Sequence, residues 1–145
     1  MTNDPVLVDS DTLSELSRGR GRVVAKATEY LERHGRLTIS SVTVFERLRG
    51  YRLALRLGKP LEQQLRAFEM LAASCIVLAV DAAVADRAAR IWAHLGARGR
   101  RAVGDILIAA TASVHQVPLV TRNRRDFEPM TRIEEVPLRL VDWTR

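Results

Sequence analysis

Short apolar runs alternate with longer amphipathic segments along almost the whole chain, and this alternation strongly constrains the fold. Runs such as PVLVD, LTIS and VPLVT have the length and composition of buried strands. The segments between them place apolar residues three and four positions apart, which is typical of helices that pack by one face. Strands that alternate with helices pair in parallel, because each connection crosses over the sheet. The sequence therefore predicts an α/β fold, with a mostly parallel central sheet flanked by helices on both faces.

The bounds of these elements follow from breaks in the pattern. We expect strands at residues 5–9, 37–40, 75–80, 117–121 and 138–143. We expect helices at residues 22–35, 43–57, 60–73, 81–97 and 105–116, the fourth capped by Asp81. The stretch ARGRRAVG (97–104) is predicted to be a loop, and RNRRDFEPM (122–130) a polar turn.

Composition narrows the class of protein. A chain of 145 residues with 47% apolar content predicts one domain spanning residues 1–145. The lone Cys75 excludes an internal disulfide, and no run approaches the roughly 20 apolar residues of a membrane span. With no signal-peptide pattern either, we expect a cytoplasmic protein. The net charge of +6 comes almost entirely from arginine, since Lys26 and Lys59 are the only lysines. This balance favours phosphate-bearing partners.

Acidic and amide side chains fall near several predicted strand ends, where the functional crevice of such a sheet lies. Two follow the first strand, one lies a turn into the helix after LTIS, one opens the helix DILIAATASVHQ, and two follow VPLVT. They are Asp9, Asp11, Glu46, Asp105, Asn123 and Asp126. Two carboxylates about 4 Å apart repel by about 4 kcal/mol at an effective dielectric near 20. Their convergence therefore predicts a cation that prefers oxygen ligands, Mg²⁺ or Mn²⁺.

Each of these acids also has a purely structural interpretation. TLSE (12–15) and TVFE (43–46) fit capping boxes, in which the glutamate bonds back to the start of its helix. Asp105 is equally consistent with a helix cap, and Asp126 with a turn residue. The three histidines have no partner at metal or catalytic spacing, and no GxSxG motif is present. Only the conjunction of acids points to a site.

Three blocks in a fixed order carry a resemblance to a known family. They are LVDSDTLSEL, ISSVTVFERLRG and VGDILIAATASVHQVPLVTRNRRDF, followed by a strand that ends in DW. This order resembles the PIN-domain ribonucleases, specifically the VapC-type toxins of type II toxin–antitoxin pairs, over nearly the whole chain. In that family three acids bind Mg²⁺ or Mn²⁺, and they correspond here to Asp9, Glu46 and Asp105.

The resemblance also implies roles around these three acids. The family's fourth acidic position corresponds to Asn123, with Asp126 close behind it, and either residue is a candidate to orient water or a second metal. Thr121 matches a supporting hydroxyl, and Asp11 lies beside the site. The implied reaction is hydrolysis of RNA to a 5′-phosphate and a 3′-hydroxyl, with Asp126 the fourth catalytic candidate.

Arginines occupy the two segments predicted to flank the acids. They are Arg98, Arg100, Arg101, Arg122, Arg124 and Arg125. An acidic pocket repels an RNA backbone unless cations offset it, so we expect these residues to bind RNA. The alternative is a solvated basic surface.

Two other functions remain open from the sequence. LVDSDTL is similar to the DxD loop of haloacid-dehalogenase-type phosphatases, with Asp9 as nucleophile and Asp11 as acid. That pattern needs a second acid four residues after Asp105, where this chain has Ala109. The other alternative is a catalytically weak RNA-binding PIN module, in which Asn123 marks a weakened site.

The toxin resemblance implies two protein partners. One is a cognate antitoxin, whose C-terminal segment would wrap the toxin and direct a basic side chain toward the acids. We expect it to bind along the helices around residues 23–31 and 48–57, whose apolar positions exceed what one core face needs. The other is a second copy of the chain in a homodimer.

Overall fold

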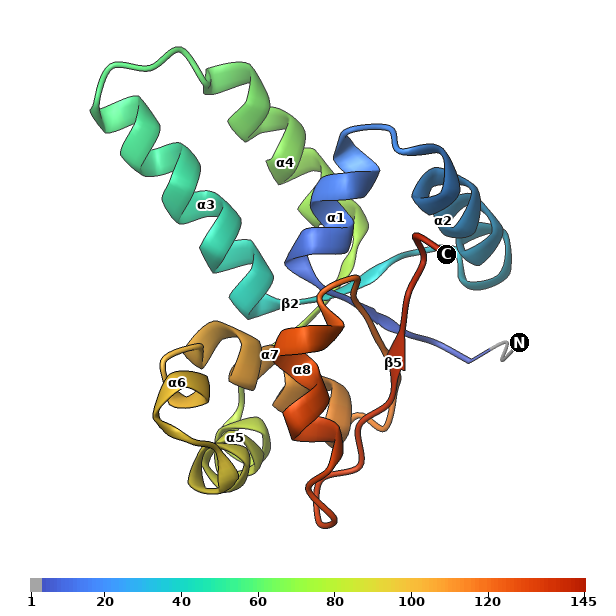
Figure 1. Ribbon diagram of the computed structural model, residues 1–145. Helices are drawn as coiled ribbons and strands as arrows, with labels where there is room; N and C mark the ends of the chain where they lie inside the picture. The colour runs from blue at the N-terminus through green and yellow to red at the C-terminus, as the bar shows by residue number, and fades with distance from the viewer. Residues whose placement is uncertain (1–3) are drawn as a thin grey trace.

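The computed structural model describes residues 4–145 and has the predicted α/β architecture (Figure 1). The strands are β1 (Leu7–Val8), β2 (Thr38–Ser40), β3 (Ile76–Leu78), β4 (Leu119–Val120) and β5 (Leu140–Val141). The helices are α1 (Ser10–Ser17), α2 (Gly21–His34), α3 (Ser41–Arg56), α4 (Glu62–Ser74), α5 (Ala82–His94), α6 (Ala97–Arg100), α7 (Val103–Val114) and α8 (Arg124–Thr131).

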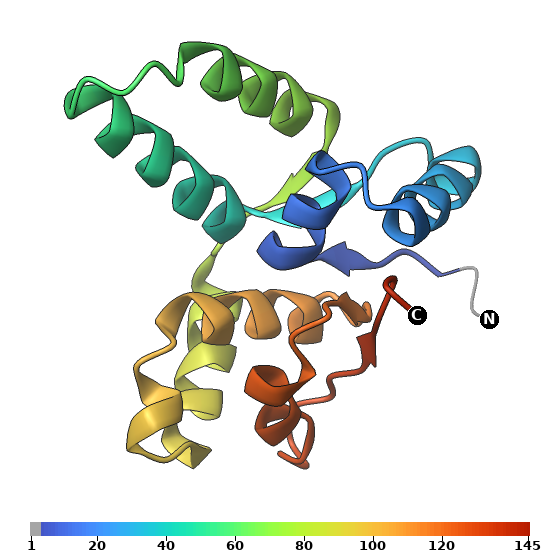
Figure 2. The same ribbon diagram turned by 45° about the horizontal axis from the view of Figure 1, so that its top comes forward.

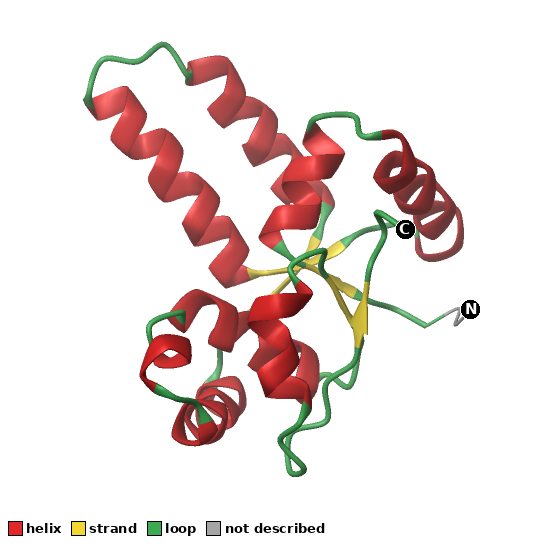
Figure 3. Cartoon of the chain, viewed as in Figure 1, coloured by secondary structure: helices red, strands yellow, loops and turns green. Residues whose placement is uncertain are grey.

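All strand pairs are parallel. β4 lies between β1 and β5, with Leu7 opposite Leu119 and Val120 opposite Val141. β2 pairs with β3, and β1 lies against β2, so that the strands meet at the centre of the molecule (Figure 3). Parallel pairing brings the carboxyl ends of the strands to one edge, as the crossover connections predict.

Two hydrophobic cores cover opposite faces of the strands. Leu7 and Leu119 point into a core with α5, α7 and α8, while Val8 and Val120 point into a second core with α1, α2 and α4. Neighbouring residues of a strand project to opposite faces, which explains why each two-residue strand serves both cores. Figure 2 shows the helices of the first half of the chain on one side of the strands and those of the second half on the other.

Three segments differ from the prediction because they are helical. Residues 10–17 form α1, which begins where the Asp9 side chain accepts a hydrogen bond from the Thr12 amide at 2.8 Å. Residues 124–131 form α8 instead of a polar turn, because Phe127 and Met130 lie three positions apart and both are buried in the core. Residues 97–100 form the short helix α6 within the predicted loop.

The capping predictions are correct for one acid and wrong for the others. Asp81 caps α5, accepting from the Val84 amide at 2.9 Å. TVFE (43–46) is not a capping box, because Ser40 caps α3 three residues before the expected cap, Thr43. TLSE (12–15) lies inside α1, and α7 begins at residue 103 with no side-chain cap, so Asp105 is not its cap.

Cys75 is a buried free thiol at the end of α4, as expected from its apolar neighbours. Within residues 4–145, no helix has both the length and the apolar content that a membrane crossing requires.

Candidate active site

Five acidic residues gather at the carboxyl edge of the strands. Asp9 directly follows β1, Asp11 lies in the first turn of α1, and Glu46 lies in the second turn of α3, which follows β2. Asp105 and Asp126 lie in the first turns of α7 and α8. Burial raises the pKa of Asp105 to about 6, and the negative charges of the other four contribute to that rise in the order Asp126, Glu46, Asp9 and Asp11. The fold thus brings together all five acids predicted from the sequence.

Asp9 is the most deeply buried acid of this group, at 4% exposure. Burial raises its pKa, and hydrogen bonds from the Thr121 side chain and from the Thr12 amide oppose that rise. The Thr121 hydroxyl also accepts from the Asn123 amide at 2.9 Å. Thr121 therefore links Asp9 to the segment that follows β4, the geometry expected of a supporting hydroxyl.

Glu46 is held from two sides. The Ser10 hydroxyl donates to Oε1 of Glu46 at 3.0 Å. Oε2 lies against the backbone of α7, where a Cβ atom added to Gly104 would be only 2.5 Å away. The absence of a side chain at residue 104 therefore lets Glu46 approach the start of α7. Neither Ser10 nor Gly104 was identified from the sequence, although the GD pair in VGDILIAATA was the available signal.

The two candidates for the fourth position contact each other. Asn123 Nδ2 donates to Oδ2 of Asp126 at 2.8 Å. Asp126 is exposed, and its charge is the largest electrostatic influence on Asp105. The hydrogen bond from Asn123 thus holds one oxygen of the Asp126 carboxylate.

The donor set fits a cation that prefers oxygen ligands. Burial and, after it, four neighbouring carboxylates raise the pKa of Asp105 to about 6, and a divalent ion would offset the repulsion among these charges. Among residues 4–145, no three Asp, Glu, His or Cys side chains already stand close enough to ligate one ion. Ligation by Asp9, Glu46 and Asp105 therefore requires their side chains to turn toward a common point.

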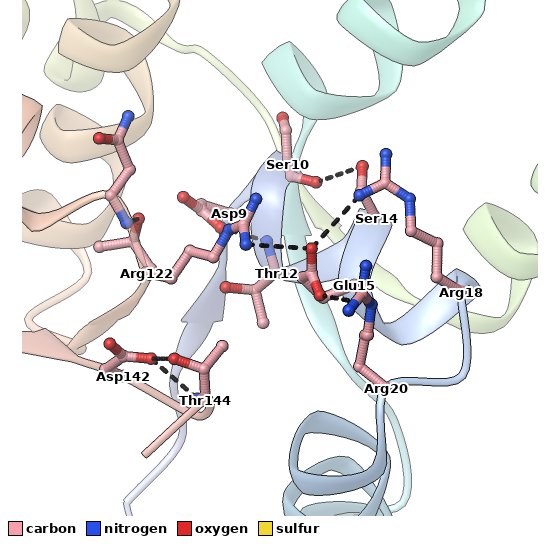
Figure 4. Close-up of polar contacts among 12 residues, drawn as sticks. Asp9, Ser10, Thr12, Ser14, Glu15, Arg18, Arg20, Arg122, Asp142 and Thr144 are labelled. Atoms are coloured by element: carbon pink, nitrogen blue, oxygen red, sulfur yellow. Dashed lines mark hydrogen bonds and ion pairs between the residues drawn. The ribbon is translucent and has the colours of Figure 1, made fainter.

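A buried glutamate beside the acids pairs with three arginines, one of which, Arg122, is among the six predicted to bind RNA. Glu15 is 4% exposed and pairs with Arg122 at 3.2 Å, and with Arg18 and Arg20 at 3.3 Å each. Figure 4 shows Arg122 reaching past Asp9 to Glu15 from the segment after β4. From the sequence, Glu15 was assigned only to a capping box. Its pairing with Arg122 could not be predicted because the two residues are far apart in the chain.

The six predicted arginines have different surroundings. Arg100 stacks on Trp92 at 4.1 Å and donates to the Trp92 carbonyl at 3.1 Å, so its guanidinium is already engaged. Arg98, Arg101 and Arg125 line one hollow between α6 and α8, and Arg124 is exposed.

A second hollow, of about 570 Å³, lies between α3 and the α6–α7 junction and contains two of the acids. Glu46 and Asp105 line it together with Arg101, and Arg49 and Phe45 of α3 form its outer wall. Phe45 and Arg49 were not predicted as site residues.

The comparisons with known proteins agree with this arrangement. Residues 6–133 match the family model described as PIN domain. The chain belongs to the PIN-domain family. No curated protein matches this PIN domain significantly by sequence.

Solved structures share the fold of this PIN domain. They include DNA-bound VapBC from Salmonella typhimurium, with 24% identity, a TM-score of 0.74 and coverage of 96% of this chain and 98% of that one. VapBC-1 from nontypeable Haemophilus influenzae has 24% identity, a TM-score of 0.72 and coverage of 98% and 100%. A toxin–antitoxin complex from Klebsiella pneumoniae has 23% identity, a TM-score of 0.63 and coverage of 94% and 95%. The family match over residues 6–133 confirms the PIN-domain membership predicted from the sequence, and the solved structures share its fold.

Proposed function

We propose that this PIN domain is a Mg²⁺- or Mn²⁺-dependent endoribonuclease and the toxin of a toxin–antitoxin pair. The observation that carries the proposal is the convergence of Asp9, Asp11, Glu46 and Asp126 on Asp105 at the carboxyl edge of a PIN fold. PIN toxins are nucleases, and the similar solved structures include a complex described as toxin–antitoxin. The RNA substrate and the metal are our inference from the acids and from the arginine excess.

Asp9, Glu46 and Asp105 would hold the metal. When bound, the ion lowers the pKa of a water molecule and polarises the phosphodiester. Asp126, oriented by Asn123, would accept the proton of the attacking water, and Thr121 keeps Asp9 in place through its hydroxyl. Arg101, which shares the hollow with Glu46 and Asp105, would bind the RNA backbone against the repulsion of the acids.

The test is cleavage of RNA by the purified protein. We expect cleavage with Mg²⁺ or Mn²⁺ and none in chelator. Asp9→Asn and Glu46→Gln should each slow it at least about a hundredfold, because charge stabilisation at such a centre is the main contribution to the rate. Full activity of either variant would overturn the assignment. Binding of RNA without cleavage would instead support the weak RNA-binding module.

The phosphatase alternative has less support. It needs Asp11 as an acid beside a nucleophilic Asp9, and Asp11 is exposed on α1, in a chain that belongs to the PIN family. An aspartyl-phosphate formed on Asp9 would restore this alternative.

An antitoxin and a second copy of the chain are the proposed protein partners, and the cytoplasm is the proposed location. Most apolar residues of α2 that were predicted to bind the antitoxin pack in the protein's own core instead, since Val23, Ala27 and Tyr30 are buried. The most exposed apolar residues of the proposed surface are Leu53 on α3 and Leu57 directly after its last residue. Suppression of cleavage by the product of an adjacent reading frame, and loss of that suppression in Leu53→Asp, would test the antitoxin surface.

A further inference from the structure

The hollow between α3 and the α6–α7 junction has features that hydrolysis alone does not require. Its outer wall carries Phe45 and Val103, which are 61% and 54% exposed although both are large and apolar. The guanidinium of Arg49 lies 5.5 Å from the centre of the Phe45 ring. Figure 1 shows the start of α3 facing the junction where α6 leads into α7.

The charges of this hollow divide into two zones. Glu46 and Asp105 line it and are partly buried, while Arg49 and Arg101 also line it and are exposed. Across residues 4–145, the ion pairs of the structure include neither of these two arginines. No carboxylate pairs with either guanidinium there, so both can bind phosphate oxygens close to the proposed reaction centre, Arg49 from its place over the Phe45 ring.

We infer that this hollow is a subsite for one unstacked nucleotide next to the scissile phosphate, with its base on Phe45 and its backbone on Arg49 and Arg101. The inference rests on the proposed ribonuclease function and assigns to it one base-stacking residue, Phe45, and two phosphate-binding residues, Arg49 and Arg101. The volume of about 570 Å³ lies within the roughly 300–1,000 Å³ typical of small-ligand sites.

A nucleotide fits these observations better than a peptide does. Base stacking on an exposed aromatic ring, with arginines along the backbone, is the usual arrangement for single-stranded nucleic acids. A paired base offers no free face to Phe45, so a duplex cannot use the subsite. The α7 helix also begins at the hollow without a side-chain cap, which adds a partial positive charge where a phosphate would lie.

The test is single-turnover cleavage of single-stranded oligoribonucleotides in which one nucleotide at a time is abasic. We expect one abasic position next to the cleaved bond to slow the wild type about tenfold or more, the effect of losing one stacked base. Phe45→Ala should slow cleavage of the intact RNA by the same factor and show no further loss on the abasic RNA. Phe45→Trp keeps an aromatic ring at this position and should cleave the intact RNA at the wild-type rate. Met70→Ala, which removes an apolar side chain that is 75% exposed on α4, is the matched control and should leave cleavage unchanged.

Binding of a fluorescent single-stranded RNA in chelator provides a readout that is independent of cleavage. Phe45→Ala should weaken this binding about tenfold and leave duplex binding unchanged. If Phe45→Ala cleaves RNA as fast as the wild type does, the subsite is overturned. It is also overturned if Phe45→Ala loses only dimerisation or antitoxin binding. A wild type that cleaves no RNA would instead overturn the proposed function.

Discussion

A Cβ atom at residue 104 would lie 2.5 Å from Oε2 of Glu46 and 3.3 Å from its carboxyl carbon. The contact joins α3 to the first turn of α7, immediately before Asp105. Because Ser10 holds the other oxygen of Glu46 at 3.0 Å, the carboxylate is confined between α1 and α7. The glycine thus sets where one proposed metal ligand stands relative to another.

Gly104→Ala should displace the Glu46 carboxylate and slow RNA cleavage about tenfold or more, since misplacement of a positioned group by about 1 Å costs up to a hundredfold. The folded protein should remain stable, because the displaced atoms are the far end of a flexible side chain. Cleavage rates and melting curves measure the two effects separately.

Gly50→Ala is the matched control for that variant. Gly50 also lies in a helix, and its Cβ would meet nothing within 4 Å. Alanine there should raise stability by about 0.5–1 kcal/mol and leave cleavage unchanged. If Gly104→Ala cleaves RNA as fast as Gly50→Ala does, the confinement of Glu46 has no catalytic role.

Glu15→Gln should lower the free energy of unfolding by about 1–3 kcal/mol, the usual contribution of hydrogen bonds to a buried charged group. The change weakens contacts with three arginines, and Arg122 connects α1 to the segment after β4. Urea denaturation measures this loss in the free energy of unfolding. The control is Glu29→Gln, whose ion pair with Arg33 is exposed and should contribute less than about 0.5 kcal/mol. Equal losses in the two variants would contradict a structural role for the Glu15 network.

The sequence predicted the elements whose pattern is local and missed those decided by distant contacts. The buried stripe of α7 and the apolar run of β4 were recognisable because their own residues show the pattern. The segment SDTLSELS reads as polar, and its helix forms because Asp9 caps it and Leu13 enters the second core. RRDFEPMT contains Pro129 and four charges, and only burial of Phe127 and Met130 against α7 makes it helical.

The same distinction applies to the site. The convergence of Asp9, Glu46 and Asp105 was predictable because the order of their three blocks is characteristic of a family, and their role as metal ligands stays a prediction. Their partners were not predictable, since Ser10 reaches Glu46 across 36 residues and Arg122 reaches Glu15 from beyond β4. Tertiary structure alone creates those contacts.

Asp105 should give the metal-free protein a characteristic pH dependence. Its pKa is about 6 in the folded protein against an ordinary value of 3.8, so between these values the folded state binds a proton that the unfolded chain does not. The free energy of unfolding should therefore decrease as the pH rises from about 4 to about 6 and stay lower above that range. Urea denaturation in chelator should show this slope in the wild type and a shallower one in Asp105→Asn. Identical slopes would show that Asp105 titrates normally.

Asp126→Asn should reduce cleavage by at least about tenfold, because general-base contributions typically reach a hundredfold or more. Asn123→Ala should cause a smaller loss, since Asn123 acts by donating to Oδ2 of Asp126. Single-turnover rates of both variants rank the two residues. The reverse ranking would assign the fourth position to Asn123.

The central claim is that the acids around Asp105 form a divalent-cation site, and melting curves with and without Mn²⁺ test it most directly. In chelator, Asp105→Asn relieves repulsion with its acidic neighbours and should melt at or above the wild-type temperature. With Mn²⁺ at a hundredfold excess over Kd, the wild type should gain about 2.7 kcal/mol and the variant much less. A wild type with no Mn²⁺-dependent shift, or a variant that shifts equally, would contradict the claim.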